Sequence, residues 1–384
     1  MKNYAVFGAG LMGSVIARDL LNTESEARVT LIDSDKNTLE QVTEFVKRNR
    51  IKTYQLDITD TDSAVHILTG HDVAICALPH RFSLACIEAA IQSRVSLVDL
   101  VGEAPEQRQA LHQKILDAGV IIIPGCGVAP GLSNICVAKG VSLLDETNEA
   151  VIYVGGIPKQ KTPPLNYQTV YSLYSVFNAY NRPAMILDNG NEKNVEPLSG
   201  LEHIEFPGPI GTLEAFYTDG LASLTLTMKG KVKNHLAEKT LRYPGFVERI
   251  KFLKDCGLID TKPVSIASAQ IAPIELLIHQ LTPKLKLGPA GDWLVMRVVV
   301  KGIKDGIKQT HLFELIDQFD PKTQYTAMAR TTGFPATIAA RMISDGLITE
   351  RGIQFPEQVF EGERYDYLLS GLEKYEIKIR HFIE

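Results

Sequence analysis

The sequence predicts a two-domain α/β protein, in which a doubly wound parallel sheet is followed by an α+β domain with a mixed sheet. Up to about residue 124, short apolar runs alternate with helical patterns, and a glycine-rich turn joins the first run to the first helix. Beyond Leu144 the pattern changes to β-branched runs separated by long loops rich in Pro and Gly. The 384 residues suffice for two cores. We expect a dinucleotide-binding Rossmann domain at 1–128, a substrate-binding and oligomerisation domain at 129–325, and a helical segment at 326–384 that returns to the first domain.

The first predicted strand and helix enclose a glycine fingerprint. The apolar run at 4–8 predicts a buried strand, SVIARDLL predicts a helix, and GAGLMG lies between them. A GxGxxG sequence in this context is typical of dinucleotide binding, because its glycines allow a tight turn, close backbone approach to a pyrophosphate and close helix packing. The residues that we expect to contact the cofactor here are Gly8, Gly10, Leu11, Met12 and Gly13.

The second predicted strand, ARVTLID, ends at Asp33. An acid at this position accepts hydrogen bonds from the adenosine ribose hydroxyls and repels a 2′-phosphate. Ser34 and Asp35 follow, and no arginine stands beside them. The sequence therefore favours NAD over NADP as the cofactor.

Four further strands complete a predicted sheet of six. A helix with the apolar stripe Leu39, Val42, Phe45 and Val46 precedes the strands, which we place in IKTYQLD, HDVAICAL, SLVDL and, after a helix at about 105–118, GVIIIP. Ligands of such sheets bind beyond the carboxyl ends of the strands. We therefore expect cofactor contacts from Asp57, near the adenine, and from Ala77, Leu78 and Pro79.

The loop PGCGVAPGLSN, Pro124 to Asn134, follows the sixth strand and precedes an apolar helix at 135–144. We expect its glycines to let the backbone approach the nicotinamide and the substrate closely.

In the second domain, VIYVGGIP, SLTLTMKGKV, VSIASAQ and LVMRVVVKGI predict strands. The tail TTGFPATIAARMISDGLI predicts a helix that Thr331 or Thr332 caps, with Pro335 in its first turn.

Charge and cysteine usage exclude several classes of protein. The net charge is −5 without a basic stripe, so we expect no nucleic-acid partner. No apolar run reaches the roughly 20 residues that span a bilayer, and MKNYAVFGAG lacks a signal-peptide pattern, so we expect a cytoplasmic protein without a membrane partner. Five scattered cysteines without a CxxC pair fit neither a disulfide framework nor a zinc site, and we expect no metal.

Several segments together resemble the saccharopine dehydrogenase-like family, in particular its lysine 6-dehydrogenase branch. They are GCGVAPGLSN, VGGIP with PPLNYQTVYSLYSV, LEAFYTDGL, KTLRYPG and ARTTGFPATIAARMI, in order along nearly the whole chain. The resemblance implies NAD-dependent oxidation of L-lysine, a small-molecule amino acid substrate, at the ε-carbon. The product would be allysine, which cyclises to piperideine-6-carboxylate. We also expect a homodimer or larger homo-oligomer.

Departures from the saccharopine reductases favour that branch. Those enzymes resemble this chain but read GLDPGIDH at GVAPGLSN, so that two acids become Ala129 and Ser133 and a histidine becomes Asn134. They also carry an arginine in the helix that here contains Tyr174, and a tyrosine at His80. The missing arginine suits a smaller substrate with one carboxylate fewer.

Two residues are candidates for proton transfer. His80 follows the fourth strand, and an imidazole accepts and donates protons near neutral pH. Asp99 ends the fifth strand and could orient the ammonium or a water molecule. Their alternatives are a surface or helix-capping position for His80 and a hydrogen bond to loop backbone for Asp99.

The candidate substrate-binding residues are Asn134, Tyr167, Tyr174 and Arg242. Tyr167 and Tyr174 would share one face of a helix, although packing in the core explains them equally well. Arg242 suits the lysine α-carboxylate, because a guanidinium binds a carboxylate bidentately, and an internal ion pair is its alternative. We expect His235 in a loop.

Two rival functions stay open: an imine reductase that makes a saccharopine- or carboxynorspermidine-like secondary amine, and a non-catalytic NAD-binding protein.

Overall fold

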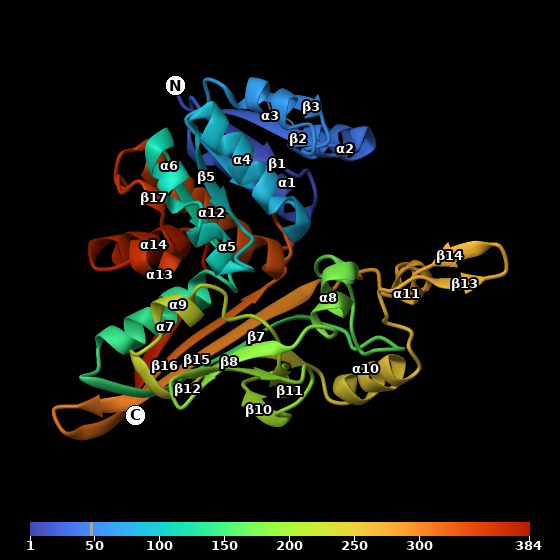
Figure 1. Ribbon diagram of the computed structural model, residues 1–384, viewed down its shortest axis with the longest axis vertical. Coiled ribbons are helices and arrows are strands. Elements are labelled where there is room, and N and C mark those ends of the chain that lie inside the picture. Colours follow the sequence, from blue (N-terminus) through green and yellow to red (C-terminus); the bar gives the residue numbers. More distant parts are fainter. Residues whose placement is uncertain (47–48) are drawn as a thin grey trace. The chain divides into compact units, whose positions relative to one another are not determined.

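The computed structural model describes residues 1–46 and 49–384, and its contacts divide the chain into two compact units (Figure 1). The first unit comprises Met1–Lys139, Ala222–Thr227 and Ala329–Lys378, and the second comprises Gly140–Leu221, Met228–Met328 and Ile379–Glu384. Two short segments depart from the boundaries that the sequence suggests. Residues 222–227 lie in the first unit, and the last six residues lie in the second.

The first unit is built on a fully parallel sheet of seven strands in the order β17-β6-β5-β4-β1-β2-β3. The six predicted strands are present, and β17, a two-residue strand from the C-terminal segment, extends the sheet beyond β6. The strands are β1 (Asn3–Phe7), β2 (Arg28–Asp33), β3 (Ile51–Gln55), β4 (Val73–Cys76), β5 (Ser96–Asp99), β6 (Ile121–Pro124) and β17 (Gly352–Ile353).

Helices of the first unit alternate with these strands, as a doubly wound sheet requires. They are α1 (Leu11–Thr23), α2 (Lys36–Val46), α3 (Thr61–Leu68), the 3₁₀ turn η1 (His80–Phe82), α4 (Ser83–Ser93), α5 (Pro105–Gln109), α6 (His112–Ala118), α7 (Leu132–Ser142), α9 (Leu224–Thr227), α12 (Ala327–Ser344), α13 (Pro356–Val359) and α14 (Glu363–Glu373). The apolar stripe on α2 is narrower than predicted: Leu39, Val42 and Val46 are buried, but Phe45 is 36% exposed and lies under the guanidinium of Arg18.

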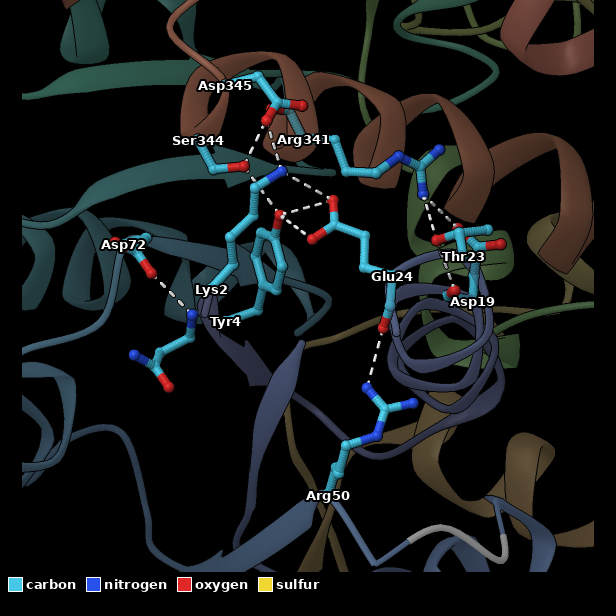
Figure 2. A network of polar contacts seen from close by, with 11 residues as sticks. Lys2, Tyr4, Asp19, Thr23, Glu24, Arg50, Asp72, Arg341, Ser344 and Asp345 are labelled. Carbon is cyan, nitrogen blue, oxygen red and sulfur yellow. Dashed lines mark hydrogen bonds and ion pairs between the residues drawn. The ribbon is translucent and has the colours of Figure 1, made fainter. Parts of the chain in front are cut away.

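Polar contacts hold α12, the long helix near the C-terminus, against β1 and α1 (Figure 2). Tyr4 Oη lies 2.8 Å from Ser344 Oγ, and Arg341 Nη1 donates to Asp19 Oδ2 at 3.0 Å. Asp19 is almost fully buried, so this pair is shielded from water and from salt. These contacts explain why Ala329–Lys378 is part of the dinucleotide-binding unit.

The second unit holds a mixed sheet of nine strands. Its main path runs β10-β11-β12-β7-β15-β16-β18. Strand β8 pairs with β12, and β9 pairs with β8. β12 and β7 are parallel, and the other pairs are antiparallel (Figure 1). The strands are β7 (Glu146–Pro158), β8 (Ala184–Asp188), β9 (Asn191–Val195), β10 (Glu202–Phe206), β11 (Gly211–Tyr217), β12 (Val232–Arg242), β15 (Asp292–Lys304), β16 (Ile307–Gln318) and β18 (Ile379–Ile383). The hairpin of β13 (Val264–Ile266) and β14 (Ala269–Ile271) and the helices α8 (Leu173–Ala179), α10 (Phe246–Asp255) and α11 (Pro273–Leu281) complete the unit.

The prediction of a strand at SLTLTMKGKV is wrong for most of its length. Residues Leu224–Thr227 form the short helix α9, and only Val232 belongs to a strand. Thr227 Oγ1 donates to Glu357 Oε1 at 2.7 Å and lies 3.1 Å from Ser223 O. Tertiary contacts therefore override the alternating pattern of Leu and Thr, which by itself favours a strand.

The start of the C-terminal helix is also corrected. Helix α12 begins at Ala327, so Thr331 and Thr332 lie inside it, and Pro335 is an interior residue rather than a first-turn residue. The cap is distant in sequence: the Asp292 carboxylate accepts from the backbone N–H groups of Ala327 at 2.7 Å and Met328 at 3.0 Å. A capping side chain 35 positions away leaves no local signal in the sequence.

Candidate active site

The turn between β1 and α1 has the backbone geometry that a dinucleotide cradle needs. Gly8 has φ +94°, and a Cβ there would lie 2.6 Å from Ala77 O. A Cβ on Gly13 would lie 1.8 Å from Gly8 O, so both positions require glycine. Around Gly10, in contrast, a Cβ would meet nothing within 4 Å, and Gly10 offers no side-chain cap to the helix. The start of α1 therefore presents backbone N–H groups beside open space, which fits a pyrophosphate.

Asp33 supports this cradle directly. Its Oδ2 accepts from Ala9 N at 2.7 Å, and its Oδ1 accepts from Asp35 N at 2.9 Å. The carboxylate is thus fixed at the carboxyl end of β2, beside the glycine turn. Asp35 adds a second carboxylate, whose pKa is lowered by hydrogen bonds from Thr38 and Asn37.

The other predicted cofactor residues lie at carboxyl ends of neighbouring strands. Ala77 N donates to Phe7 O at 2.8 Å, so the segment of Ala77, Leu78 and Pro79 follows β4 directly beside β1. Leu11 is 53% exposed at the start of α1. Asp57 is exposed two residues after β3, and hydrogen bonds from Thr59 lower the pKa of its carboxyl.

His80 begins the 3₁₀ turn η1 immediately after Pro79. Its side chain is 54% exposed, and its Nδ1 lies 3.7 Å from Glu103 Oε2. This distance exceeds a hydrogen bond but allows electrostatic attraction. His80 is therefore accessible at the carboxyl end of β4, on the edge of the sheet where the cofactor cradle lies.

Asp99 occupies a different environment, because it is 0% exposed. Its Oδ1 accepts from Val101 N at 2.9 Å, and its Oδ2 accepts from Ser83 Oγ, which also accepts from Arg108 Nη2. Burial raises the pKa of Asp99, and the charge of Arg108 opposes the rise. The structure thus places Asp99 inside the first unit, where it fixes the turn after β5. Sequence reasoning did not anticipate Ser83 and Arg108, which lie on separate helices.

The glycines of the PGCGVAPGLSN loop have an internal structural reason. Gly127 N donates to Pro130 O at 3.0 Å, and Leu132 N donates to Gly127 O at 2.9 Å. A Cβ on Gly131, which has φ +130°, would lie 2.0 Å from Gly127 O. The loop folds back on itself so tightly that a side chain at Gly131 would clash with the backbone of Gly127 and displace it. This packing explains the loss of side chains there without a ligand.

Asn134, in the first turn of α7, belongs to the same loop. Its Oδ1 accepts from Ser133 Oγ at 3.1 Å, and its Nδ2 donates to Ser223 Oγ at 3.3 Å. The side chain is 0% exposed. Asn134 therefore ties the loop to the 222–227 segment, which explains why that segment belongs to the first unit.

Tyr167 and Tyr174 do not share a helix face. Helix α8 begins at Leu173, so Tyr174 lies in it, while Tyr167 precedes it in an irregular segment. Tyr167 is buried in the core, but Tyr174 is 41% exposed. Tyr174 lines a depression of about 550 Å³ together with Glu275, Ile278, His279, Thr282 and Pro283.

The structure brings Tyr167 together with Arg242 instead. The guanidinium of Arg242 lies 5.0 Å from the Tyr167 ring centroid and 5.6 Å from that of Phe246. Arg242 is 5% exposed at the end of β12, and its Nη1 donates to Leu241 O.

The prediction that His235 lies in a loop is wrong: it is the fourth residue of β12. Burial lowers the pKa of His235.

The helices and side chains of residues 1–46 and 49–384 bear on two further classes of protein. None of the helices there is both long and apolar enough to cross a bilayer. Within the same ranges, no cluster of three or more His, Cys, Asp or Glu side chains has the arrangement of a metal site.

The parallel sheet and its glycine cradle define the class of protein, which is a Rossmann-type dinucleotide-binding protein. Two family profiles then match nearly the whole chain: "Saccharopine dehydrogenase NADP binding domain" over residues 4–123 and "Saccharopine dehydrogenase C-terminal domain" over residues 127–377. The chain belongs to the saccharopine dehydrogenase family of oxidoreductases.

Relatives of established name are distant but span the full chain. The NADP(+), L-glutamate-forming saccharopine dehydrogenase of Saccharomyces cerevisiae is 25% identical, over 99% of this chain and 98% of its own. Carboxynorspermidine synthase of Vibrio cholerae is 24% identical, over 92% of this chain and 91% of its own. The solved structure of apo histidine-tagged saccharopine dehydrogenase (L-Glu forming) from S. cerevisiae superposes with a TM-score of 0.82 at 20% identity, over 100% of both chains. This last likeness concerns the fold.

Proposed function

We propose that the protein catalyses the NAD-dependent oxidative deamination of L-lysine at its ε-carbon, giving allysine and its cyclic form, piperideine-6-carboxylate. Membership of the saccharopine dehydrogenase family supports an oxidoreductase acting on an amine of an amino acid. The observation that carries the finer proposal is the absence of the arginine that the saccharopine reductases carry in the helix that here contains Tyr174. Its absence suits a smaller substrate with one carboxylate fewer.

The residues present fit a nicotinamide dinucleotide. The open space at Gly10 and the uncapped start of α1 accommodate the pyrophosphate, and Asp33 would hold the adenosine ribose. The description of the family profile names NADP. In this chain, however, the carboxylates of Asp33 and Asp35 would lie close to a 2′-phosphate on the adenosine ribose. Repulsion between these anions supports NAD as the cofactor of this chain. When bound, the nicotinamide supplies the acceptor for the hydride.

The chain's own residues would bind the amino acid and move protons. A hydride leaves the ε-carbon only when the amine nitrogen is neutral, and the unperturbed ε-ammonium has a pKa of about 10.4. His80, exposed after β4, is the proposed proton acceptor, and Arg242 is the proposed partner of the α-carboxylate. Asp99 would act only indirectly, because its carboxylate is buried and hydrogen-bonded within the first unit.

One alternative has support of its own. The similarity to carboxynorspermidine synthase favours an imine reductase that joins an amine to a carbonyl compound. Such an enzyme would consume reduced cofactor only when both partners are present.

A panel of substrates separates the two functions. Purified protein is supplied with NAD or NADP and with L-lysine, L-ornithine, saccharopine or a diamine, and formation of the reduced cofactor is followed by absorbance. In the reverse direction, reduced cofactor is supplied with an aldehyde or keto acid plus an amine. Lysine with NAD should give the highest kcat/KM. A reaction that requires saccharopine, or an amine together with a carbonyl partner, would contradict the proposal.

A further inference from the structure

Three polar side chains form a row on one face of β12. Glu238, Thr240 and Arg242 occupy alternate positions of the strand, and side chains two residues apart share a face. Glu238 is 3% exposed and Arg242 is 5% exposed, whereas Thr240 between them is partly exposed. The row is therefore partly accessible between its two charged ends, at Thr240. Sequence reasoning singled out only Arg242, although the alternation in EKTLR predicts the shared face.

The carboxyl group of Glu238 is held by hydroxyl groups alone. Thr218 Oγ1 donates to its Oε2 at 2.6 Å, and Thr240 Oγ1 lies 3.5 Å from its Oε1. A Cβ on Gly220 would lie 2.6 Å from Oε2, so the backbone of Gly220 covers the carboxyl closely. In the part of the chain that the structure describes, no basic side chain forms an ion pair with Glu238. Ionising a buried carboxyl without a cation is costly, so a cation that reached Glu238 would favour its charged form.

Arg242 shows the complementary feature. A guanidinium has five N–H donors, but within the described residues Arg242 Nε is buried without a hydrogen-bond partner. Its Nη1 donates to its neighbour's carbonyl, Leu241 O, and the rings of Tyr167 and Phe246 lie against the guanidinium. The guanidinium is therefore oriented by its surroundings yet keeps a donor for a ligand.

Both charged ends lie within electrostatic reach of Tyr180. Burial raises the pKa of the Tyr180 phenol, the charge of Arg242 opposes the rise, and the charge of Glu238 adds to it. Both charged ends of the row are thus close enough to affect the same phenol. A cationic and an anionic group on either side of a partly exposed threonine, on one face of a strand, match a ligand that carries an anion and a cation on one carbon.

We propose that Glu238 binds the α-ammonium of the substrate while Arg242 binds its α-carboxylate, so that this row on β12 selects α-amino acids over simple amines. The inference rests on the proposed function, because it assigns the recognition of the substrate's α-carbon end. Glu238 is then a specificity-determining residue, and the proton acceptor for the ε-amine is a separate group.

Binding of an ammonium group would change the protonation state of the Glu238 carboxyl. Burial raises the pKa of Glu238 to about 8; Thr218 and Arg242 oppose the rise, and Asp219 adds to it. At pH 7 the free protein therefore holds most of this carboxyl in the protonated form. An arriving ammonium favours the carboxylate, lowers its pKa and expels the proton. Binding of lysine at pH 7 should release a proton that originates from Glu238.

The test compares Glu238→Gln with a matched control, Glu202→Gln. Glu202 pairs with Lys239, which occupies the opposite face of β12, so the control makes the same change on the same sheet. The substrates are L-lysine and 6-aminohexanoate, which keeps the carboxylate and the amine to be oxidised but lacks the α-ammonium. Glu238→Gln should lower kcat/KM for lysine about 10- to 100-fold, mainly through KM, the range expected for a hydrogen bond between charged groups. It should change kcat/KM for 6-aminohexanoate less than about twofold.

Calorimetry of lysine binding at pH 7, in buffers of different ionisation enthalpy, gives a readout that does not depend on turnover. The parent protein and Glu202→Gln should release more protons than Glu238→Gln. Equal losses for both substrates, or equal proton release in all three proteins, would overturn the role of Glu238 and leave lysine oxidation standing. If lysine is bound with this proton release but is not oxidised, the proposed function fails while the inference stands.

Discussion

A single carboxylate, Asp33, is the proposed determinant of the choice between NAD and NADP. Its charge stands at the end of β2, and its oxygens hold the backbone of Ala9 and Asp35. Asp33→Asn keeps a hydrogen-bond acceptor but removes the charge. We expect the ratio of kcat/KM for NAD over NADP to fall about tenfold or more, the equivalent of about 1.4 kcal/mol. Steady-state kinetics with both cofactors measure this ratio, and a parent protein that prefers NADP would contradict the assignment.

A single imidazole is the proposed proton acceptor. His80→Asn should lower kcat and flatten the acidic limb of the pH–rate profile, because asparagine cannot take up the proton. The control is His66→Asn, which alters an exposed histidine of α3. If His80→Asn leaves the profile unchanged, His80 is not the acceptor. Asp99 would not be the proton acceptor in that case, because both of its carboxylate oxygens already accept hydrogen bonds in the interior of the first unit.

The cap of α12 can be tested as an element. Asp292 is 0% exposed and accepts two backbone N–H groups at the start of the helix. Asp292→Ala should destabilise the protein by about 1–2 kcal/mol, the upper range for a lost N-cap, and Asp292→Asn should cost less because one acceptor remains. Thermal unfolding at fixed pH measures both, with Asp255→Ala in the exposed last turn of α10 as the control. An unchanged midpoint for Asp292→Ala would refute the cap.

The elements differ in how far the sequence predicts them. Strong local patterns, such as the apolar runs of β1 and β6 and the glycine turn before α1, gave the parallel sheet correctly. The failures involve partners that are distant in sequence. Thr227 bonds to Glu357 and turns a strand-like segment into α9, and Asp292 moves the start of α12 forward to Ala327. Neither contact leaves a signal in the residues around it.

The candidate site divides in the same way. The predicted cofactor residues follow from the spacing of glycines and from Asp33, and the structure shows the tight glycine turn with Asp33 bonded to it. The substrate residues depend on how strands and irregular segments fold together. Tyr167 meets Arg242 rather than Tyr174, and Glu238 emerges only when β12 places it on the face of Arg242. Spacing along the chain does not encode these contacts.

The proposed reaction has a proton balance that applies to the protein as a whole. Lysine as its ε-ammonium, NAD and water yield an aldehyde, an ammonium ion, NADH and one proton. Each rise of one pH unit therefore shifts the equilibrium towards products about tenfold, or about 1.4 kcal/mol. The neutral amine also becomes more abundant towards its pKa of about 10.4, so forward turnover should increase on the alkaline side of neutrality.

The ratio of ammonia released to NADH formed, with L-lysine as the only amine, tests the proposed reaction most directly. Oxidative deamination requires one ammonia for each NADH, because water replaces the nitrogen after the hydride has left. We expect a ratio of about one across the alkaline range, with all NADH formation dependent on lysine. NADH formed without ammonia, or no NADH from lysine under conditions in which a secondary amine is oxidised, would contradict the account and favour the imine reductase.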